Sequence, residues 1–213
     1  MAAPMVPPLG ARIRAERLRR GMTVRGLARD IGVSASLISQ IETNKSQPSV
    51  STLYAITTAL NLPVEELFGA HGEPAPAAAL AELAAVGAGE SVRVVGADRE
   101  RTVGPHVQPA ERELIDLDSG VTWERLGQVP GRHVDFLLIT YPPGSTSSGR
   151  GDLMRHTGTE YGYLVSGELL LTLGFDEHHL VTGDAVCFDS STPHGYRNDG
   201  AVPAVGVWFV LER

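Results

Sequence analysis

The sequence has little cysteine, few aromatic residues and no long apolar run. Its single cysteine, Cys187, cannot form a disulfide within the chain, and it lies in the apolar run AVCF, which predicts a small buried side chain. No apolar run reaches the roughly 18 residues that a membrane span requires, and the start MAAPMVPPLG lacks the basic and apolar regions of a secretory signal. We therefore expect a cytoplasmic protein with no membrane partner.

The charge of the chain is divided unevenly along its length. The net charge is -7, yet residues 1–69 carry eight Lys or Arg against five Asp or Glu, and the remaining residues carry ten against 20. Lys and Arg supply most of the non-specific affinity for nucleic acid by neutralising phosphates. This pattern predicts that only the first part of the chain faces a polyanion.

Apolar spacing divides the chain into two domains of different type. Residues 1–69 show apolar residues at helical spacing, interrupted by Gly, Ser, Asn and Pro, which predicts four or five short helices. Residues 70–90 are rich in Gly, Pro and Ala and are typical of a linker. Residues 91–213 contain short β-rich runs such as SVRVV, HVDFLLITY and AVGVWFV, separated by turn residues. We expect an α+β protein whose second domain is a β-sandwich or β-barrel.

Residues 23 to 42 have the pattern of two helices joined by a tight turn. Thr23 and Ser34 each precede a helical run and can cap it, and Gly32 can adopt the positive φ that ends the first helix. Ala28, Ile38 and Ile41 fall where a helix-turn-helix needs a small contact and two core anchors.

The second of these helices is amphipathic. We predict a buried stripe of Leu37, Ile38 and Ile41. The opposite face is polar and consists of Ser36, Ser39, Gln40 and Thr43. Serine can bond base edges or phosphates, and glutamine can bond adenine through two atoms, so this face can recognise a major groove. The alternative is that the polar stripe is only a solvated helix face.

The segment MTVRGLARDIGVSASLISQIETNKSQPSVSTLYAITTALNLPVEELF resembles the lambda-repressor-like, or XRE, helix-turn-helix family. The resemblance implies a five-helix bundle whose third helix, about Ala35 to Glu42, enters the major groove of a double-stranded operator as one half of a homodimer. That helix has no Arg or Lys, so phosphate contacts are expected from Arg25, Arg29, Lys45, backbone amides and the first helix. The alternative for the arginines of the first helix is a merely solvated face, and no base contact is assigned to them. The predicted DNA-binding residues are Thr23, Arg25, Ser34, Ala35, Ser36, Ser39, Gln40, Thr43, Asn44 and Lys45.

The spacing of histidine, glutamate and glycine in the second domain resembles the two motifs of the cupin superfamily. His156 stands four residues before Glu160, and Gly183 stands eleven before His194. The resemblance implies a closed antiparallel β-barrel, the double-stranded β-helix, with a ligand cavity. Carried over by position, His156, Glu160 and His194 are the metal-ligand candidates, and Met154 occupies the place of the family's first histidine.

Two interpretations of these three residues stay open. Two histidines and one carboxylate can hold a divalent metal such as Fe, Mn, Ni or Zn with open positions. Without metal, the same residues would form a buried hydrogen-bonded network or contact an organic effector directly. Met154 and Tyr196 are expected to line the effector pocket, whereas Tyr161 and Tyr163 alternate with Glu160 and should point away from it.

The two domains together favour a transcriptional regulator that binds a small effector and changes its operator affinity. The alternative is a mononuclear non-haem iron enzyme, because the domain order and the triad also resemble the hydroxypropylphosphonate epoxidase family. The intact polar face of the recognition helix favours the regulator.

Overall fold

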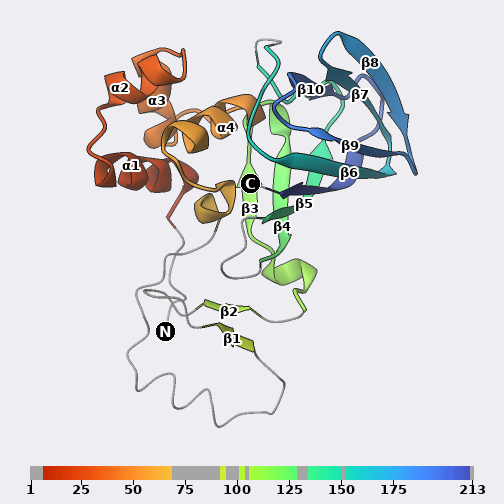
Figure 1. Cartoon of the computed structure of the whole chain (residues 1–213), viewed down its shortest axis with the longest axis horizontal. Coiled ribbons are helices and arrows are strands. Elements are labelled where there is room, and N and C mark those ends of the chain that lie inside the picture. Colours follow the sequence, from red (N-terminus) through yellow and green to blue (C-terminus); the bar gives the residue numbers. More distant parts are fainter. Residues whose placement is uncertain are drawn as a thin grey trace.

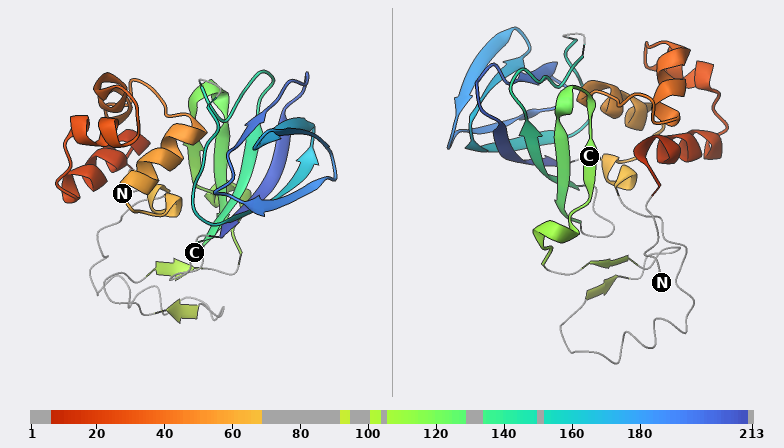
Figure 2. Two further views of the ribbon diagram at one scale, coloured as in Figure 1. Left: turned by 45° about the horizontal axis from the view of Figure 1, so that its top comes forward. Right: turned by 180° about the vertical axis from the view of Figure 1, so that it is seen from behind.

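The computed structural model describes residues 7–68, 92–94, 101–103, 106–128, 134–149 and 152–211, and the expected linker at 70–90 lies outside these ranges. A bundle of helices packs against one side of an antiparallel β domain, as the α+β prediction required (Figure 1). Two further views show the same arrangement (Figure 2). Within the described ranges, no helix combines the length and the apolar content needed to cross a membrane.

The helical part is one helix shorter than the expected five-helix bundle. Its described residues form α1 (Leu9–Arg19), α2 (Val24–Asp30), α3 (Ala35–Glu42) and α4 (Val50–Ala59). In the fifth place, Val64–Leu67 form a single 3-10 turn, in which the amide of Glu66 donates to the carbonyl of Pro63 over 3.1 Å. This one turn already buries Val64 and Leu67 against the core, so the bundle is complete without a fifth α-helix.

The helix-turn-helix has the caps that its sequence predicts. The Thr23 hydroxyl accepts from the amide of Gly26 at 2.9 Å, and the Ser34 hydroxyl accepts from the amide of Leu37 at 3.1 Å. Gly32 lies between the two helices with a φ of +72°, which confirms its expected role in the turn. Ala28, Ile38 and Ile41 are buried as expected. Leu37, by contrast, is only half-buried, so the apolar stripe of α3 is narrower than predicted.

The first helix is not the solvated arginine face that its sequence suggests. Arg17 is buried and donates to both carboxylate oxygens of Glu42, at 2.5 and 2.8 Å, and to the carbonyl of Met22. Arg12 is also buried. The expected solvated face was therefore wrong for these two residues, whereas Arg14 and Arg19 are exposed as expected. The Arg17–Glu42 ion pair links α1 to α3, which no pattern within one helix reveals.

The described strands form three antiparallel sheets. The smallest is the pair β1 (Val92–Val94) and β2 (Arg101–Val103). The large sheet has the order β3-β4-β5-β11-β6-β9, and the third has the order β10-β7-β8. Their strands are β3 (Leu114–Asp116), β4 (Thr122–Gly127), β5 (Val134–Tyr141), β6 (Thr159–Ser166), β7 (Glu168–Leu173), β8 (Asp176–Val181), β9 (Ala185–Asp189), β10 (His194–Arg197) and β11 (Ala204–Leu211).

The hydrogen bonds of these described strands do not form one closed barrel. The chain leaves the large sheet at the end of β9 and enters the third sheet at β10, and the two sheets are joined by side-chain packing. Tyr196 of β10 lies edge-on to Trp208 of β11, with ring centroids 5.5 Å apart. Phe188 of β9 lies edge-on to His194 of β10 at 5.0 Å. The expected closed barrel is therefore seen as two antiparallel sheets with an aromatic interior.

The outer face of the large sheet is apolar. Its exposed large apolar side chains are Leu114 of β3, Tyr161, Tyr163 and Val165 of β6, and Phe209 and Leu211 of β11. Tyr161 and Tyr163 thus point away from the interior, as their alternation with Glu160 predicted. Cys187 of β9 pairs with Tyr161 and is exposed, so the expectation of a buried cysteine was wrong. The reason is that Cys187 shares the outward face with Tyr161, whereas its neighbours Val186 and Phe188 pack against the core.

Helix α4 joins the helical bundle to the β domain. The amide of Ser51 donates to the carbonyl of Ser147 at 3.0 Å, and the carbonyl of Pro48 accepts from the amide of Asp118 at 2.9 Å. The Arg125 guanidinium of β4 also lies over the ring of Phe68, 5.6 Å from its centroid. The two domains are therefore in direct contact through α4 and the segment that follows it.

Candidate functional site

The polar face of α3 is exposed along its whole length. Ser36, Ser39 and Gln40 are exposed on the helix, and Thr43 is exposed at its C-terminal cap. Ser34 at the N-terminal cap is also exposed, and Ala35 is half-buried. The structure thus brings most of the predicted DNA-binding residues to one accessible surface of the helix.

Two predicted DNA-binding side chains already have partners in the protein. The Thr43 hydroxyl donates to the carbonyl of Ser39 at 2.8 Å, so its proton is used within the helix. The side-chain oxygen of Asn44 accepts from the amide of Gly10 at 3.0 Å and so ties the end of α3 to the start of α1. Both residues therefore have a structural role that the sequence pattern did not indicate.

The expected phosphate-binding residues lie at the edges of this face. Arg25 and Lys45 are exposed, and Thr23 is exposed while its hydroxyl caps α2. Arg29 is exposed as well and lies 3.5 Å from the carboxylate of Asp30. Because α3 itself has no basic side chain, these flanking residues are the cations available to neutralise phosphates near it.

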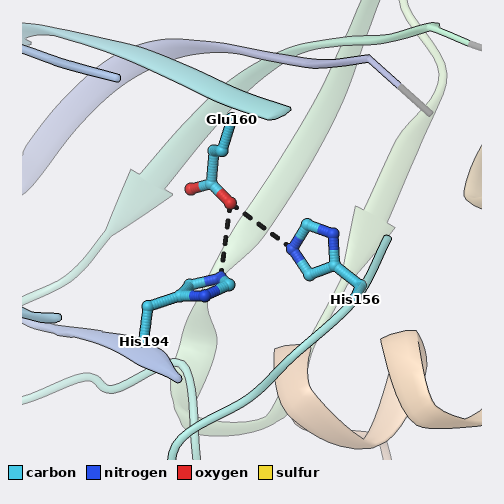
Figure 3. A group of neighbouring side chains, drawn as sticks. All are labelled: His156, Glu160 and His194. Carbon is cyan, nitrogen blue, oxygen red and sulfur yellow. Dashed lines mark ion pairs between the residues drawn. The ribbon is translucent and has the colours of Figure 1, made fainter. Parts of the chain in front are cut away.

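The second candidate site is the cluster of His156, Glu160 and His194 inside the β domain. Glu160 comes from β6, His194 from the start of β10, and His156 from the segment that precedes β6. The three side chains point toward one another from these three segments (Figure 3). All three are buried, and each offers a ligand atom within 4.8 Å of the others. The spacing that the sequence indicated does bring these residues together.

The geometry of the cluster suits a single metal ion. One carboxylate oxygen of Glu160, Oε2, lies 3.4 Å from Nε2 of His156 and 3.3 Å from Nε2 of His194. Ligand atoms about 2.0 to 2.2 Å from one metal are separated from each other by about 3 to 3.5 Å at the usual angles. Both histidine nitrogens are therefore already at the separation from Oε2 that coordination of a shared ion requires.

The remaining ring nitrogens orient the two imidazoles. Nδ1 of His194 lies 2.8 Å from the carbonyl oxygen of Thr192, and Nδ1 of His156 lies 3.4 Å from that of Thr157. A carbonyl oxygen accepts a hydrogen bond, so these contacts favour the neutral imidazole that carries its hydrogen on Nδ1. In that form each Nε2 has a lone pair. In the described part of the chain neither Nε2 has a hydrogen-bond partner, although both are buried. Two buried imidazole nitrogens that face one carboxylate oxygen form a donor set suited to a divalent cation.

A second chain of contacts fixes Glu160. The Tyr196 hydroxyl donates to Oε1 of Glu160 at 2.7 Å and accepts from Nε1 of Trp208 at 3.2 Å. Burial raises the pKa of Glu160, but the two facing imidazoles outweigh this effect and hold the pKa at about 2. Burial and the charge of Glu160 raise the pKa of Tyr196 well above its usual value, so the phenol remains a donor. Glu160 is thus ionised, with Oε2 directed at the histidines.

A cavity of about 10 Å³ lies beside Glu160. Met154 and Tyr196, the two predicted pocket residues, both line it, and so do Trp123 and Trp208. Sequence reasoning did not name the other lining residues, and two of them, Val50 and Tyr54, belong to α4 of the helical domain. No local signal could have found them, since they approach the cavity only through the packing of one domain on the other.

Family models match both domains of the chain. One described as helix-turn-helix matches residues 13–67, and one described as cupin domain matches residues 137–210. The HTH-type transcriptional regulator PuuR of Escherichia coli is 28% identical over 194 residues, which are 90% of this chain and 88% of that protein. The chain therefore combines a helix-turn-helix domain with a C-terminal cupin domain and is similar over most of its length to a regulator of the helix-turn-helix type. It is a DNA-binding transcriptional regulator.

Solved structures agree with this domain order. An HTH_3 family transcriptional regulator from Vibrio cholerae superposes with a TM-score of 0.60 at 19% identity, covering 96% of this chain and 95% of the other, and so shares the fold. Hydroxypropylphosphonic acid epoxidase from S. wedmorenis reaches a TM-score of 0.44 at 15% identity, covering 95% of this chain and 96% of that chain. The latter similarity is too low to support an argument about activity.

Proposed function

We propose that the cupin domain binds a small effector at the His156–Glu160–His194 cluster and thereby changes the affinity of the helix-turn-helix domain for its operator. The observation that carries this proposal is the pair of buried, unpartnered Nε2 atoms that face Oε2 of Glu160 within the described residues. Such a pair is suited to holding a divalent cation. The regulator would act in the cytoplasm, where its operator lies.

We further propose that His156, Glu160 and His194 hold the cation, with Fe, Mn, Ni or Zn as candidates. Three protein ligands leave open positions, and the metal would offer these to donor atoms of the effector. The protein's own residues orient the ligands. The carbonyls of Thr157 and Thr192 fix the imidazoles, and Tyr196 occupies the other carboxylate oxygen.

Elemental analysis of protein purified without chelator tests this site. We expect wild-type protein to take up one equivalent of at least one of the four metals, and we expect His156→Ala, Glu160→Ala and His194→Ala each to lose it. His178→Ala is the matched control, because His178 is an exposed histidine of β8. A wild-type protein that stays metal-free and yet responds to an organic effector would assign the cluster to direct effector binding instead.

DNA recognition by the exposed face of α3 is proposed for a homodimer on a pseudo-palindromic operator, since one short helix contacts too few base pairs for useful specificity. The apolar outer face of the large sheet supports this proposal, because exposed apolar patches of this kind mark interfaces. A second copy of this chain is the occupant that a twofold operator requires. Sequencing DNA fragments that co-purify with the protein would define the operator and its symmetry.

The enzyme alternative can be tested separately. The aligned curated relative is a transcriptional regulator, which supports a binding role for the cupin domain. Protein loaded with ferrous iron should therefore show no aerobic turnover of a panel of small phosphonates. Turnover that is abolished by Glu160→Ala would instead assign an oxidative activity to the cluster.

A further inference from the structure

Helix α4 of the DNA-binding domain forms one wall of the cupin site. The ring of Tyr54 stacks on the ring of His156, with centroids 4.0 Å apart and planes 5° from parallel. Tyr54 also contacts Trp123 of β4 at a centroid distance of 5.4 Å. One turn earlier, Val50 lines the same cavity. The helix beside His156 in Figure 3 thus brings a residue of the DNA-binding domain against a candidate metal ligand.

The cavity closed by this wall is too small for an organic effector. Its volume is about 10 Å³. A cavity of roughly 10 to 15 Å³ holds one water molecule, whereas sites for small ligands span about 300 to 1,000 Å³. An effector that reaches Glu160 must therefore displace one of the walls.

The walls differ in how firmly they are held. Glu160, Tyr196 and Trp208 lie on strands whose backbones are fixed by sheet hydrogen bonds. Among the described residues, the main-chain hydrogen bonds that attach α4 to the β domain lie near the start of the helix, where Ser51 donates to Ser147 and Pro48 accepts from Asp118. The wall formed by α4 is consequently the one that can move without breaking a sheet.

A groove between the domains leads to this wall. It has a volume of about 430 Å³ and is lined by Ser51 and Thr52 of α4 on one side and by Leu153 and Arg155 of the β domain on the other. Met154 lines both the groove and the inner cavity. Met154 is therefore a wall that the groove and the inner cavity share, and the groove has the volume that a small effector needs.

Movement of α4 would carry the DNA-binding domain with it. Leu53 and Ile56 of α4 are fully buried in the core that also contains Leu27 of α2 and Ile38 of α3. Close-packed cores of this kind transmit displacement rather than absorb it. The orientation of α3 is thus tied to the position of α4.

We propose that α4 is both the lid of the effector site and the element that transmits its occupancy to the recognition helix. An effector fills the site only when the Tyr54 ring leaves His156, so effector binding and docking of α4 exclude each other. This inference rests on the proposed function, because it takes the cupin cavity as the effector site. By linkage, operator DNA must also change the docking of α4 if docking alters operator affinity.

Tryptophan fluorescence can test the lid without knowledge of the effector. The protein has two tryptophans, Trp123 and Trp208, and both are buried and line the cavity. Quenching by acrylamide therefore reports how often the site opens. Loss of an aromatic stack should shift the docking equilibrium by about two- to tenfold, so Tyr54→Ala should raise the quenching constant. Tyr54→Phe retains the ring and should behave as wild type.

The controls keep this test decisive. Thr58→Ala alters an exposed residue one turn further along α4 and should leave quenching unchanged. Tyr54→Leu retains apolar volume and replaces the alanine variant if that variant does not fold. Operator DNA should change quenching of the wild type and have a much smaller effect on Tyr54→Ala. If folded wild-type protein and a folded Tyr54→Ala or Tyr54→Leu variant are quenched equally, α4 is not the lid of the site. If operator DNA changes quenching equally in the wild type and the variant, α4 does not transmit occupancy of the site to the recognition helix.

Failure of the effector proposal would look different. In that case no compound would alter the operator affinity of the wild type, although removal of the Tyr54 ring would still expose the tryptophans. The quenching experiment contains acrylamide and no effector, so its result does not depend on which effector is found.

Discussion

Gln40 and Lys45 lie on the same exposed surface but should contribute differently to DNA binding. We expect Gln40→Ala to weaken specific binding by about 1 to 3 kcal/mol and to relax the preference at one base pair, as happens when a bidentate base contact is lost. Lys45→Ala should weaken binding to all DNA sequences alike. It should also lower the slope of log affinity against log salt concentration by about 1. Fluorescence anisotropy with single-substituted operators at several salt concentrations measures both effects. An unchanged sequence preference in Gln40→Ala would show that another face contacts the bases.

Met154 occupies the position at which a fourth metal ligand would be expected from the cupin resemblance. Its main chain pairs with that of His194, and its side chain lines the cavity beside Glu160. A thioether binds hard and borderline divalent ions poorly, so Met154→His should tighten metal binding by adding an imidazole. Competition with a chromophoric chelator measures the change. Met154→Leu is the control, and equal metal affinity of the two variants would place Met154 out of reach of the ion.

The Arg17–Glu42 pair should be important for the stability of the DNA-binding domain. Both side chains are buried, with 6% and 4% of their surface exposed. Removing one partner leaves an unpaired buried charge, so Arg17→Met should destabilise the domain by about 3 to 5 kcal/mol. Urea unfolding measures the loss, and Arg14→Ala, at an exposed position of α1, should have little effect. A loss of unfolding free energy below about 1 kcal/mol would mean that water reaches the ion pair and screens it.

Single residues were predictable where their role is local. The caps at Thr23 and Ser34 and the positive φ of Gly32 follow from the chain within a few residues of each. The cluster of His156, Glu160 and His194 was found because the cupin resemblance supplies long-range information. Arg17 was misjudged because its partner lies on another helix, and Cys187 because an apolar run does not reveal which of its side chains point outward.

The exposed face of the large sheet makes a prediction at the level of an element. Tyr163 of β6 and Leu211 of β11 are exposed among other apolar side chains. If this face is the dimer interface, Tyr163→Lys should weaken self-association, because burying an unpaired ammonium costs several kcal/mol. Light scattering across a concentration series measures the effect. Phe175→Lys is the control, since Phe175 is fully exposed in the turn between β7 and β8. Equal dimerisation of both variants would exclude this face.

Elements were predictable to the extent that their apolar pattern is strong. The runs HVDFLLITY and AVGVWFV correspond to β5 and β11, whose residues alternate between more and less buried positions. Strand β8 was missed because its burial is nearly uniform, with one buried residue, Leu180. Strand β10 is only four residues long and gives no periodic signal. The expected fifth helix was replaced by a 3-10 turn because four residues suffice to bury its apolar side chains.

At the scale of the whole molecule, the sequence indicated the two domains but not how they meet. The charge asymmetry and the change of apolar period separate a helical domain from a β domain. The contact between Tyr54 and His156 joins positions in different domains, and the hydrogen bonds that hold α4 in place are made by main-chain atoms, which carry no residue-type signal. The arrangement of the domains therefore had to come from the structure.

The contact surface between α4 and the β domain also determines whether the DNA-binding domain can be transferred to another protein. Val50 and Tyr54 are almost fully buried in this structure, and Phe68 is covered beside Arg125. A fragment that ends near residue 69 would expose all three side chains to solvent. It would therefore acquire a new apolar patch that promotes association. Chimaeric biosensors that fuse these helices to a different sensory module would need a matching docking surface on the new partner. Transplants that move the β domain together with α4 should keep the contact intact.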